Sequence, residues 1–179
     1  MTAELFAIRQ PARAMRFINK GISGNTVADL QERWTDDALE QKPDILVLLI
    51  GINDLHRTLA QAPTAVPPER FAALYKDILD RTVKALPACK IVLLDPFYMT
   101  RDAASTSNRA RVLARLPAYI RVVHAMARQY RTRLIRTHDL FQKLLRTQKA
   151  EQFCGEPVHP QHTGHLAMAE AVYAVLANL

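Results

Sequence analysis

A carboxylate and an imidazole stand three residues apart near the end of the chain, at Glu156 and His159. They occupy a short turn in which Pro157 and Pro160 restrict the backbone. In such a turn the carboxylate can hold one imidazole nitrogen and leave the other free to accept a proton. This arrangement is the base-and-orienter half of a hydrolytic triad. Taken alone, Glu-x-x-His also fits a surface turn with an incidental histidine.

Two other segments carry groups that could assist such chemistry. Asn53 and Asp54 follow the apolar run Ile45–Ile50, and the loop Asn19–Thr26 contains two glycines. Asn53 would face a site if the run is a buried strand, whereas Asn-Asp can also simply turn the chain out of the strand. The backbone of the loop can approach a ligand closely and offer free N–H groups to an anion.

The remaining histidines raise the question of a metal site. His159, His162 and His165 are evenly spaced, with Cys154 nearby. Because they straddle a loop and a helix start and match no zinc-site spacing, we expect no metal there. We expect His165 to pack locally, and the other three histidines to have surface or satisfied-core roles: His56, His124 and His138.

The elements that must position these residues alternate between short apolar runs and helical patterns. The apolar runs predict strands at residues 15–18, 45–50, 90–95 and 133–137. Apolar residues at helical spacing predict helices over about residues 1–11, 27–41, 69–86, 109–130, 139–146 and 163–178. This alternation predicts an α/β fold: a three-layer α/β/α sandwich with a parallel sheet, in which the strand at 45–50 is buried on both faces.

The composition fits a single domain over residues 1–179, because a chain of this length with 49% hydrophobic residues can bury a sizeable core. Much of the net charge of +7 comes from arginines between Arg101 and Arg136. They are spread along a predicted helix and strand, without interleaved aromatic residues on which bases could stack. We therefore expect a solvated basic face and no nucleic-acid partner.

No apolar run approaches the length of a membrane span, and the first residues lack the apolar core of a secretory signal. We therefore expect a soluble, cytoplasmic protein without a membrane span. Cys89 and Cys154 show no metal or redox spacing, so we expect both to be reduced thiols. Trp34 is expected to be a core anchor.

Three segments in combination resemble the SGNH hydrolases, also called GDSL esterases and lipases. They are Asn-Lys-Gly-Ile-Ser-Gly-Asn-Thr at residues 19–26, Ile-Gly-Ile-Asn-Asp at 50–54 and Val-His-Pro at 158–160. The resemblance runs from about Phe17 to the C-terminus. It implies a flavodoxin-like parallel sheet, the SGNH hydrolase fold, and hydrolysis of carboxylic esters.

The resemblance also implies a role for each candidate residue. Gly24 would give its backbone N–H, and Asn53 its side-chain amide, to an oxyanion hole. His159 would be the general base, and Glu156 occupies the place of the family's usual aspartate. Preorganised donors at a carbonyl oxygen that becomes negative contribute about 3 kcal/mol each. Glutamate has one more methylene than aspartate, so its orienting role requires the loop to adjust.

The family's nucleophilic serine stands in a Gly-Asp-Ser motif, which this sequence does not contain. Three explanations compete. The first is an N-terminally shortened enzyme that lacks its first strand, because only 16 residues precede Phe17 whereas a strand and its crossover need roughly twenty or more. The second is a substitute nucleophile, and the candidates are Ser23, Ser105, Ser107 and Cys154. The third is a relative that binds an ester or glycan without turning it over.

We therefore expect an ester hydrolase that needs no cofactor and acts on short acyl, acetylated sugar or lysophospholipid esters. The alternative is a non-catalytic ester- or carbohydrate-binding protein. If the chain is shortened, it should turn over little or no short p-nitrophenyl ester, while a version extended upstream by a Gly-Asp-Ser strand should be active. A missing first strand would leave apolar strand edges, so we also expect marginal stability or a homo-oligomer that covers them.

Overall fold

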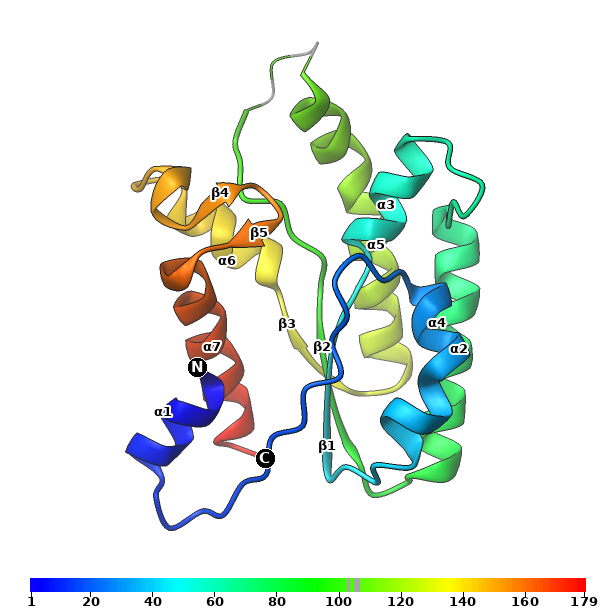
Figure 1. Cartoon of the computed structure of the whole chain (residues 1–179), viewed down its shortest axis with the longest axis vertical. Coiled ribbons are helices and arrows are strands. Elements are labelled where there is room, and N and C mark those ends of the chain that lie inside the picture. Colours follow the sequence, from blue (N-terminus) through cyan, green and yellow to red (C-terminus); the bar gives the residue numbers. More distant parts are fainter. Residues whose placement is uncertain (103, 105–106) are drawn as a thin grey trace.

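The computed structural model describes residues 1–102, 104 and 107–179. Three strands form a parallel sheet in the order β1-β2-β3 (Figure 1). They are β1 (Ile45–Leu49), β2 (Lys90–Leu94) and β3 (Arg133–Ile135). In the register of the sheet Leu49 lies beside Leu94, and Leu94 beside Ile135. The carboxyl ends of all three strands therefore meet at one edge of the sheet.

Helices cover both faces of this sheet, which confirms the predicted three-layer α/β/α sandwich (Figure 1). One layer contains α2 (Val27–Trp34), α4 (Pro68–Ala85) and α5 (Asn108–Gln129), and the other contains α1 (Thr2–Arg9) and α7 (His162–Leu176). Side chains of β2 alternate between the two. Ile91 and Leu93 pack with the first layer, whereas Val92 and Leu94 pack with the second.

The structure shows the surroundings of three residues whose roles were predicted: Trp34 as a core anchor, and His124 and His138 as surface or satisfied-core residues. Trp34 is buried and its indole N–H donates to the hydroxyl of Thr82 at 2.9 Å, so it is a core anchor. The buried carboxylate of Asp95 lies 2.7 Å from Nε2 of His124 and accepts from the backbone N–H of His138 at 3.0 Å.

Among the described residues no helix is long and apolar enough to span a bilayer.

The predicted strand at residues 15–18 is wrong. This segment has no regular secondary structure, because a strand needs a neighbour to pair with and β1 pairs only with β2 in the described part of the chain. β1 is therefore an edge strand, and the expectation that it is buried on both faces is also wrong. Leu48 is buried, but Val47 and Leu49 are 41% and 37% exposed.

The chain after β1 also differs from the prediction, in which no helix was expected between residues 41 and 69. Residues Ile52–Leu59 form a helix, α3, so Asn53 lies in its first turn. Gly51 makes this abrupt change of direction with φ of +127°, and a Cβ there would come within 3.1 Å of the Phe71 ring. Glycine is needed here for its backbone angle and for its lack of a side chain.

No helix or strand was predicted between residues 146 and 163, but the structure has short elements of both kinds there. After α6 (Thr137–Leu144), a short 3-10 helix at Ala150–Gln152 leads into an antiparallel pair, β4 (Cys154–Glu156) and β5 (His159–Pro160). A π-helical turn at Thr35–Leu39 extends α2.

Candidate functional site

The three segments singled out in the sequence meet around one cavity of about 270 Å³ at the carboxyl end of β1. We call it the three-loop cavity. Gly24 lines it from the loop before α2, Asn53 from the first turn of α3, and His159 from β5. Apolar side chains complete its walls, among them Leu49, Phe97 and Met168. His165, predicted to pack locally, also lines it.

The loop before α2 is held by contacts from two helices. Thr26 caps α2 and forms a capping box with Asp29, so the loop enters the helix in a fixed direction. The guanidinium of Arg57, on α3, donates to the carbonyl of Gly24 at 2.9 Å. Gly24 itself has φ of +81°, a region that favours glycine. Sequence reasoning missed Arg57, which carries no motif of its own.

Asn53 joins the second segment to the first. Its side-chain Nδ2 donates to the carbonyl of Asn25 at 3.0 Å. This bond uses one of the two amide hydrogens and fixes the plane of the amide. Within residues 1–102, 104 and 107–179, no hydrogen bond engages the backbone N–H of Gly24. Two N–H donors, one from Gly24 and one from Asn53, are thus available beside the same cavity.

Asp54 ties α3 to α2 beneath this site. Its buried carboxylate accepts from the backbone N–H of Val27 at 3.0 Å, and its second oxygen has no partner in the described part of the chain. Burial disfavours the charged form and raises the pKa of Asp54 to about 6, although the bond from Val27 opposes this change.

Glu156 and His159 face each other across the β4–β5 hairpin, as their spacing suggested. Oε2 of Glu156 lies 3.0 Å from Nδ1 of His159, and the hairpin has a register shift between Cys154 and Glu156. With a hydrogen on Nδ1 for the carboxylate to accept, Nε2 is the basic nitrogen. The two side chains are 73% and 71% exposed, so this pair adds little to stability.

The four candidate nucleophiles differ in position. Ser23 lines the three-loop cavity, whereas Ser107 caps α5 by accepting from the backbone N–H of Ala110 at 3.0 Å. Cys154 is unpaired and buried, and burial raises the pKa of its thiol, which disfavours the reactive thiolate. Ser105 lies outside the described residues.

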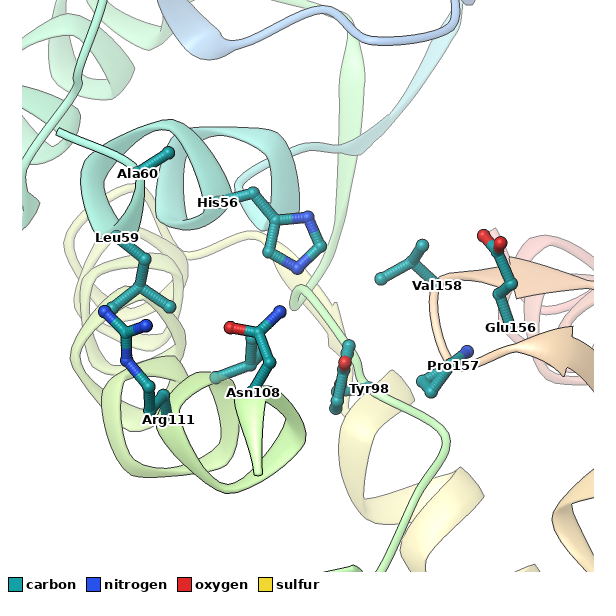
Figure 2. A pocket seen from close by; sticks show the side chains of 10 residues that line it. His56, Leu59, Ala60, Tyr98, Asn108, Arg111, Glu156, Pro157 and Val158 are labelled. Atoms are coloured by element: carbon teal, nitrogen blue, oxygen red, sulfur yellow. The ribbon is translucent and has the colours of Figure 1, made fainter. Parts of the chain in front are cut away.

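A second, larger cavity of about 470 Å³ lies on the other side of the hairpin turn. We call it the α3–α5 cavity. Figure 2 shows its walls: His56 projects from α3, Asn108 and Arg111 from α5, and Tyr98 from the segment after β2. Glu156 lines this cavity and not the three-loop cavity, while Val158 lines both. Apart from Glu156, these lining residues come from separate elements and share no motif, so no sequence pattern predicted this cavity.

In the described residues no group of three or more His, Cys, Asp and Glu side chains is arranged to hold a metal ion. His162 and His165 are both on α7, and His159 is engaged by Glu156.

Comparison with known proteins gives a consistent result. Residues 2–167 match the GDSL-like Lipase/Acylhydrolase family. An acetylxylan esterase of Geobacillus stearothermophilus is 33% identical over 167 residues, which cover 90% of this chain and 72% of that protein.

Solved structures of similar proteins agree. Axe2, an acetylxylan esterase from Geobacillus stearothermophilus, superposes with a TM-score of 0.86 at 29% identity, over 97% of this chain and 77% of Axe2. LAE5, an alpha/beta hydrolase from the metagenome of Lake Arreo, gives the same TM-score at 27% identity, over 97% of this chain and 78% of its own. In Axe2, catalytic mutants replace a serine near the start of the chain, and an aspartate and a histidine three positions apart. The chain described here belongs to the GDSL-like lipase/acylhydrolase family and is a hydrolase of the esterase class.

Proposed function

We propose that the three-loop cavity binds the carbonyl group of a carboxylic ester and that His159 is the general base for its hydrolysis. The observation that carries this proposal is that Gly24, Asn53 and His159, from three separate segments, line one cavity. The two N–H donors and the basic nitrogen are the groups that acyl transfer requires around a single carbonyl.

The reaction follows from these positions. His159 takes a proton from the attacking hydroxyl through Nε2, while Glu156 stabilises the imidazolium through Nδ1. The carbonyl carbon becomes tetrahedral, and its oxygen, now negative, accepts hydrogen bonds from the Gly24 N–H and the Asn53 amide. Collapse of the intermediate breaks the bond to the alcohol, which leaves with the proton from His159. Water then releases the acyl group by the same route, and no cofactor takes part.

Ser23 is the nucleophile that we assign within this chain, since it is the serine among the lining residues of the cavity. Its hydroxyl makes no hydrogen bond to His159 in the described part of the chain, so attack requires a change in the loop and turnover should be slow. The serine of the family motif Gly-Asp-Ser is not found in the sequence. The missing contact between Ser23 and His159 favours a second candidate function, binding of an ester or carbohydrate without turnover.

Two further observations support ester hydrolysis at the three-loop cavity. The spacing of Glu156 and His159 equals that of the catalytic aspartate and histidine of Axe2. A cavity of about 270 Å³ favours a short acyl group over a long one. Among the expected substrates, short acyl and acetylated sugar esters therefore fit better than lysophospholipids, as in the acetylxylan esterase relatives.

The test is hydrolysis of p-nitrophenyl acetate by the wild-type chain and by two histidine variants. His159→Ala should reduce the slow wild-type rate to that of the buffer. His162→Ala, which changes an exposed histidine outside the cavity lining, should keep the wild-type rate. A wild-type rate that His159→Ala does not lower would overturn the proposal.

Two more results separate the remaining alternatives. If Ser23→Ala abolishes the His159-dependent rate, Ser23 is the nucleophile. If the rate persists, another group attacks the ester and the Ser23 assignment is wrong. If the wild-type chain binds acetylated xylobiose but shows no rate above the buffer, the non-catalytic binding function holds.

A further inference from the structure

Two consecutive backbone carbonyls of the loop before α2 are bound by side chains of a single helix. Nη2 of Arg57 donates to the carbonyl of Gly24 at 2.9 Å, and Nδ2 of Asn53 donates to the carbonyl of Asn25 at 3.0 Å. Arg57 and Asn53 are four residues apart on α3, so their side chains leave the same face of the helix, one turn apart. The helix that carries the proposed oxyanion amide therefore also binds the loop segment that carries the Gly24 N–H.

Packing does little to hold Gly24 in place. Among the described residues, no heavy atom beyond its two chain neighbours lies within 4 Å of the position that a Cβ on Gly24 would occupy. Its φ of +81° is one of many backbone conformations open to glycine, which lacks a side chain. A backbone bond nearby, from the Asn25 N–H to the Ile22 carbonyl, is 3.3 Å long, near the limit for a hydrogen bond. The bonds from Arg57 and Asn53 are therefore the shorter restraints on the direction of the Gly24 N–H.

The guanidinium of Arg57 is itself tied to the start of α2. Its Nη2 lies 3.7 Å from Oδ2 of Asp29, the carboxylate that closes the capping box with Thr26. The same oxygen of Asp29 accepts from the backbone N–H of Thr26 at 2.6 Å and from the Thr26 hydroxyl at 2.7 Å. Because the Arg57 side chain is 32% exposed, its ion pair contributes little to the free energy of unfolding.

Arg57 is not one of the residues that line the three-loop cavity in the described part of the chain. Its effect on chemistry there must therefore pass through Gly24. Arg33 also binds this loop, but at the Lys20 carbonyl, at 2.9 Å, and at the side chain of Asn25, at 3.1 Å. Of the two arginines, Arg57 is the one that bonds to the backbone of Gly24.

We propose that Arg57 is a positioning residue for ester hydrolysis, which holds the Gly24 backbone so that its N–H and the Asn53 amide reach the same carbonyl oxygen. The inference rests on the proposed function and adds a residue on which the rate depends although it does not touch the ester. Donors stabilise a developing negative charge best when they are already oriented toward it, so a small displacement of one donor lowers the rate strongly. Without the guanidinium, Gly24 can change its backbone angles, whereas Asn53 keeps its bond to Asn25.

Steady-state hydrolysis of p-nitrophenyl acetate tests this role. In Arg57→Ala we expect kcat to fall by about tenfold to a hundredfold, the range for a misplaced group in an active site. KM should change by less than about twofold, because the Gly24 N–H acts on the negatively charged intermediate more than on the neutral ester.

Arg81→Ala is the matched control. Arg81, on α4, is also 32% exposed, and it donates to a backbone carbonyl, that of Gln31, at 3.1 Å. Its guanidinium lies 3.6 Å from a carboxylate, that of Asp77, and it is not among the described residues that line the three-loop cavity. Both variants should lose a similar small part of the free energy of unfolding in urea, while Arg81→Ala keeps the wild-type kcat. Equal kcat in the two variants, or a loss in Arg57→Ala that appears in KM alone, would overturn the proposal.

A second measurement needs no turnover. The ¹⁵N-labelled chains are titrated with trifluoroacetone, whose hydrated carbonyl mimics the tetrahedral intermediate, and followed by NMR. In the wild type and in Arg81→Ala, trifluoroacetone should shift the backbone amide signal of Gly24 and the side-chain amide signals of Asn53. Arg57→Ala should bind it about tenfold more weakly, with the Asn53 shift retained and the Gly24 shift reduced.

The titrations also separate failure of this inference from failure of the proposed function. If Arg57→Ala and Arg81→Ala give the same shifts and the same affinity, Arg57 has no positioning role, although the proposed oxyanion hole stands. If trifluoroacetone shifts neither the Gly24 nor the Asn53 signals of the wild type, the proposed oxyanion hole is wrong, and the role of Arg57 is wrong with it.

Discussion

The side-chain amide of Asn53 donates a hydrogen bond to the backbone carbonyl of Asn25, 3.0 Å away. This contact joins the helix after β1 to the loop that contains Gly24, and it holds the amide that we propose as an oxyanion donor. The proposal thus gives Asn53 a chemical role beside this structural one, and a substitution can separate the two.

We expect Asn53→Ala to lower kcat for p-nitrophenyl acetate by about 10²- to 10³-fold, as expected for loss of one oxyanion donor. Its free energy of unfolding should fall by only about 1 kcal/mol, for one lost hydrogen bond. Steady-state kinetics and urea unfolding measure the two effects. Gln41→Ala is the control, because it removes a side-chain bond to the Asp36 carbonyl outside the cavity. Equal losses of activity in the two variants would contradict the role of Asn53.

A substitution of Glu156 should also affect activity without affecting stability. Because Glu156 and His159 are exposed, Glu156→Gln should leave the melting temperature unchanged, yet it removes the charge that stabilises the imidazolium. We expect kcat to fall by about ten- to a hundredfold. Glu151→Gln, an exposed glutamate in the same segment, should leave kcat unchanged. If both variants keep full activity, Glu156 is an ordinary surface residue.

Asp54 predicts a pH dependence of stability. Burial raises its pKa from 3.8 to about 6, so the folded state binds the proton more tightly than the unfolded state. Its stabilising contribution is complete below pH 4 and is lost as the pH rises through 6. The loss is on the order of 3 kcal/mol. Urea unfolding of Asp54→Asn between pH 4 and 7.5 should show a correspondingly flatter slope than the wild type.

Asp80→Asn is the control, because the pKa of Asp80 is shifted in the opposite direction from that of Asp54. The ammonium of Lys76 and the hydroxyl of Tyr130 lower the pKa of the Asp80 carboxyl, so its stabilising contribution is lost as the pH falls. The prediction is wrong if the free energy of unfolding of Asp54→Asn changes with pH as steeply as that of the wild type. Burial would then not disfavour the charged form of Asp54.

In the described part of the chain β1 has a neighbouring strand on one side only, and this open edge predicts self-association. Val47 and Leu49 are 41% and 37% exposed on this strand, and Phe17 and Ile18, of the segment expected to be a strand, are 43% and 44% exposed. An unpaired apolar edge invites pairing with another chain. Sedimentation velocity should show concentration-dependent association that Val47→Lys weakens. Val83→Lys, at a valine 40% exposed on α4, should not weaken it. A monomer at all concentrations would contradict this prediction.

From the sequence it could be predicted that three separate segments lie together. The helix or strand to which some of their residues belong was predicted less well. Gly24, Asn53 and His159 could be placed together because loops at the carboxyl ends of parallel strands share one edge of a sheet. Helix α3 was missed because Asn-Asp is also a turn pair, and only the backbone angle of Gly51 decides between them. The strand at 15–18 was predicted from apolar content alone, but strand formation depends on a partner.

Other features depend on contacts between distant residues. The bonds from Arg57 to Gly24 and from Val27 to Asp54 join elements whose separation in the sequence gives no hint of contact. The α3–α5 cavity draws its walls from separate helices, a hairpin and the chain after β2, so only the folded chain reveals it. The expected cytoplasmic location stays a prediction.

The most direct test of the central claim is a crystal structure of the chain with a trifluoromethyl ketone, whose hydrated carbonyl mimics the tetrahedral intermediate. We expect one oxygen of the hydrated ketone to lie about 2.7 to 3.1 Å from the backbone nitrogen of Gly24 and from Nδ2 of Asn53, with His159 beside the second hydroxyl. A ketone bound away from these three residues would contradict it.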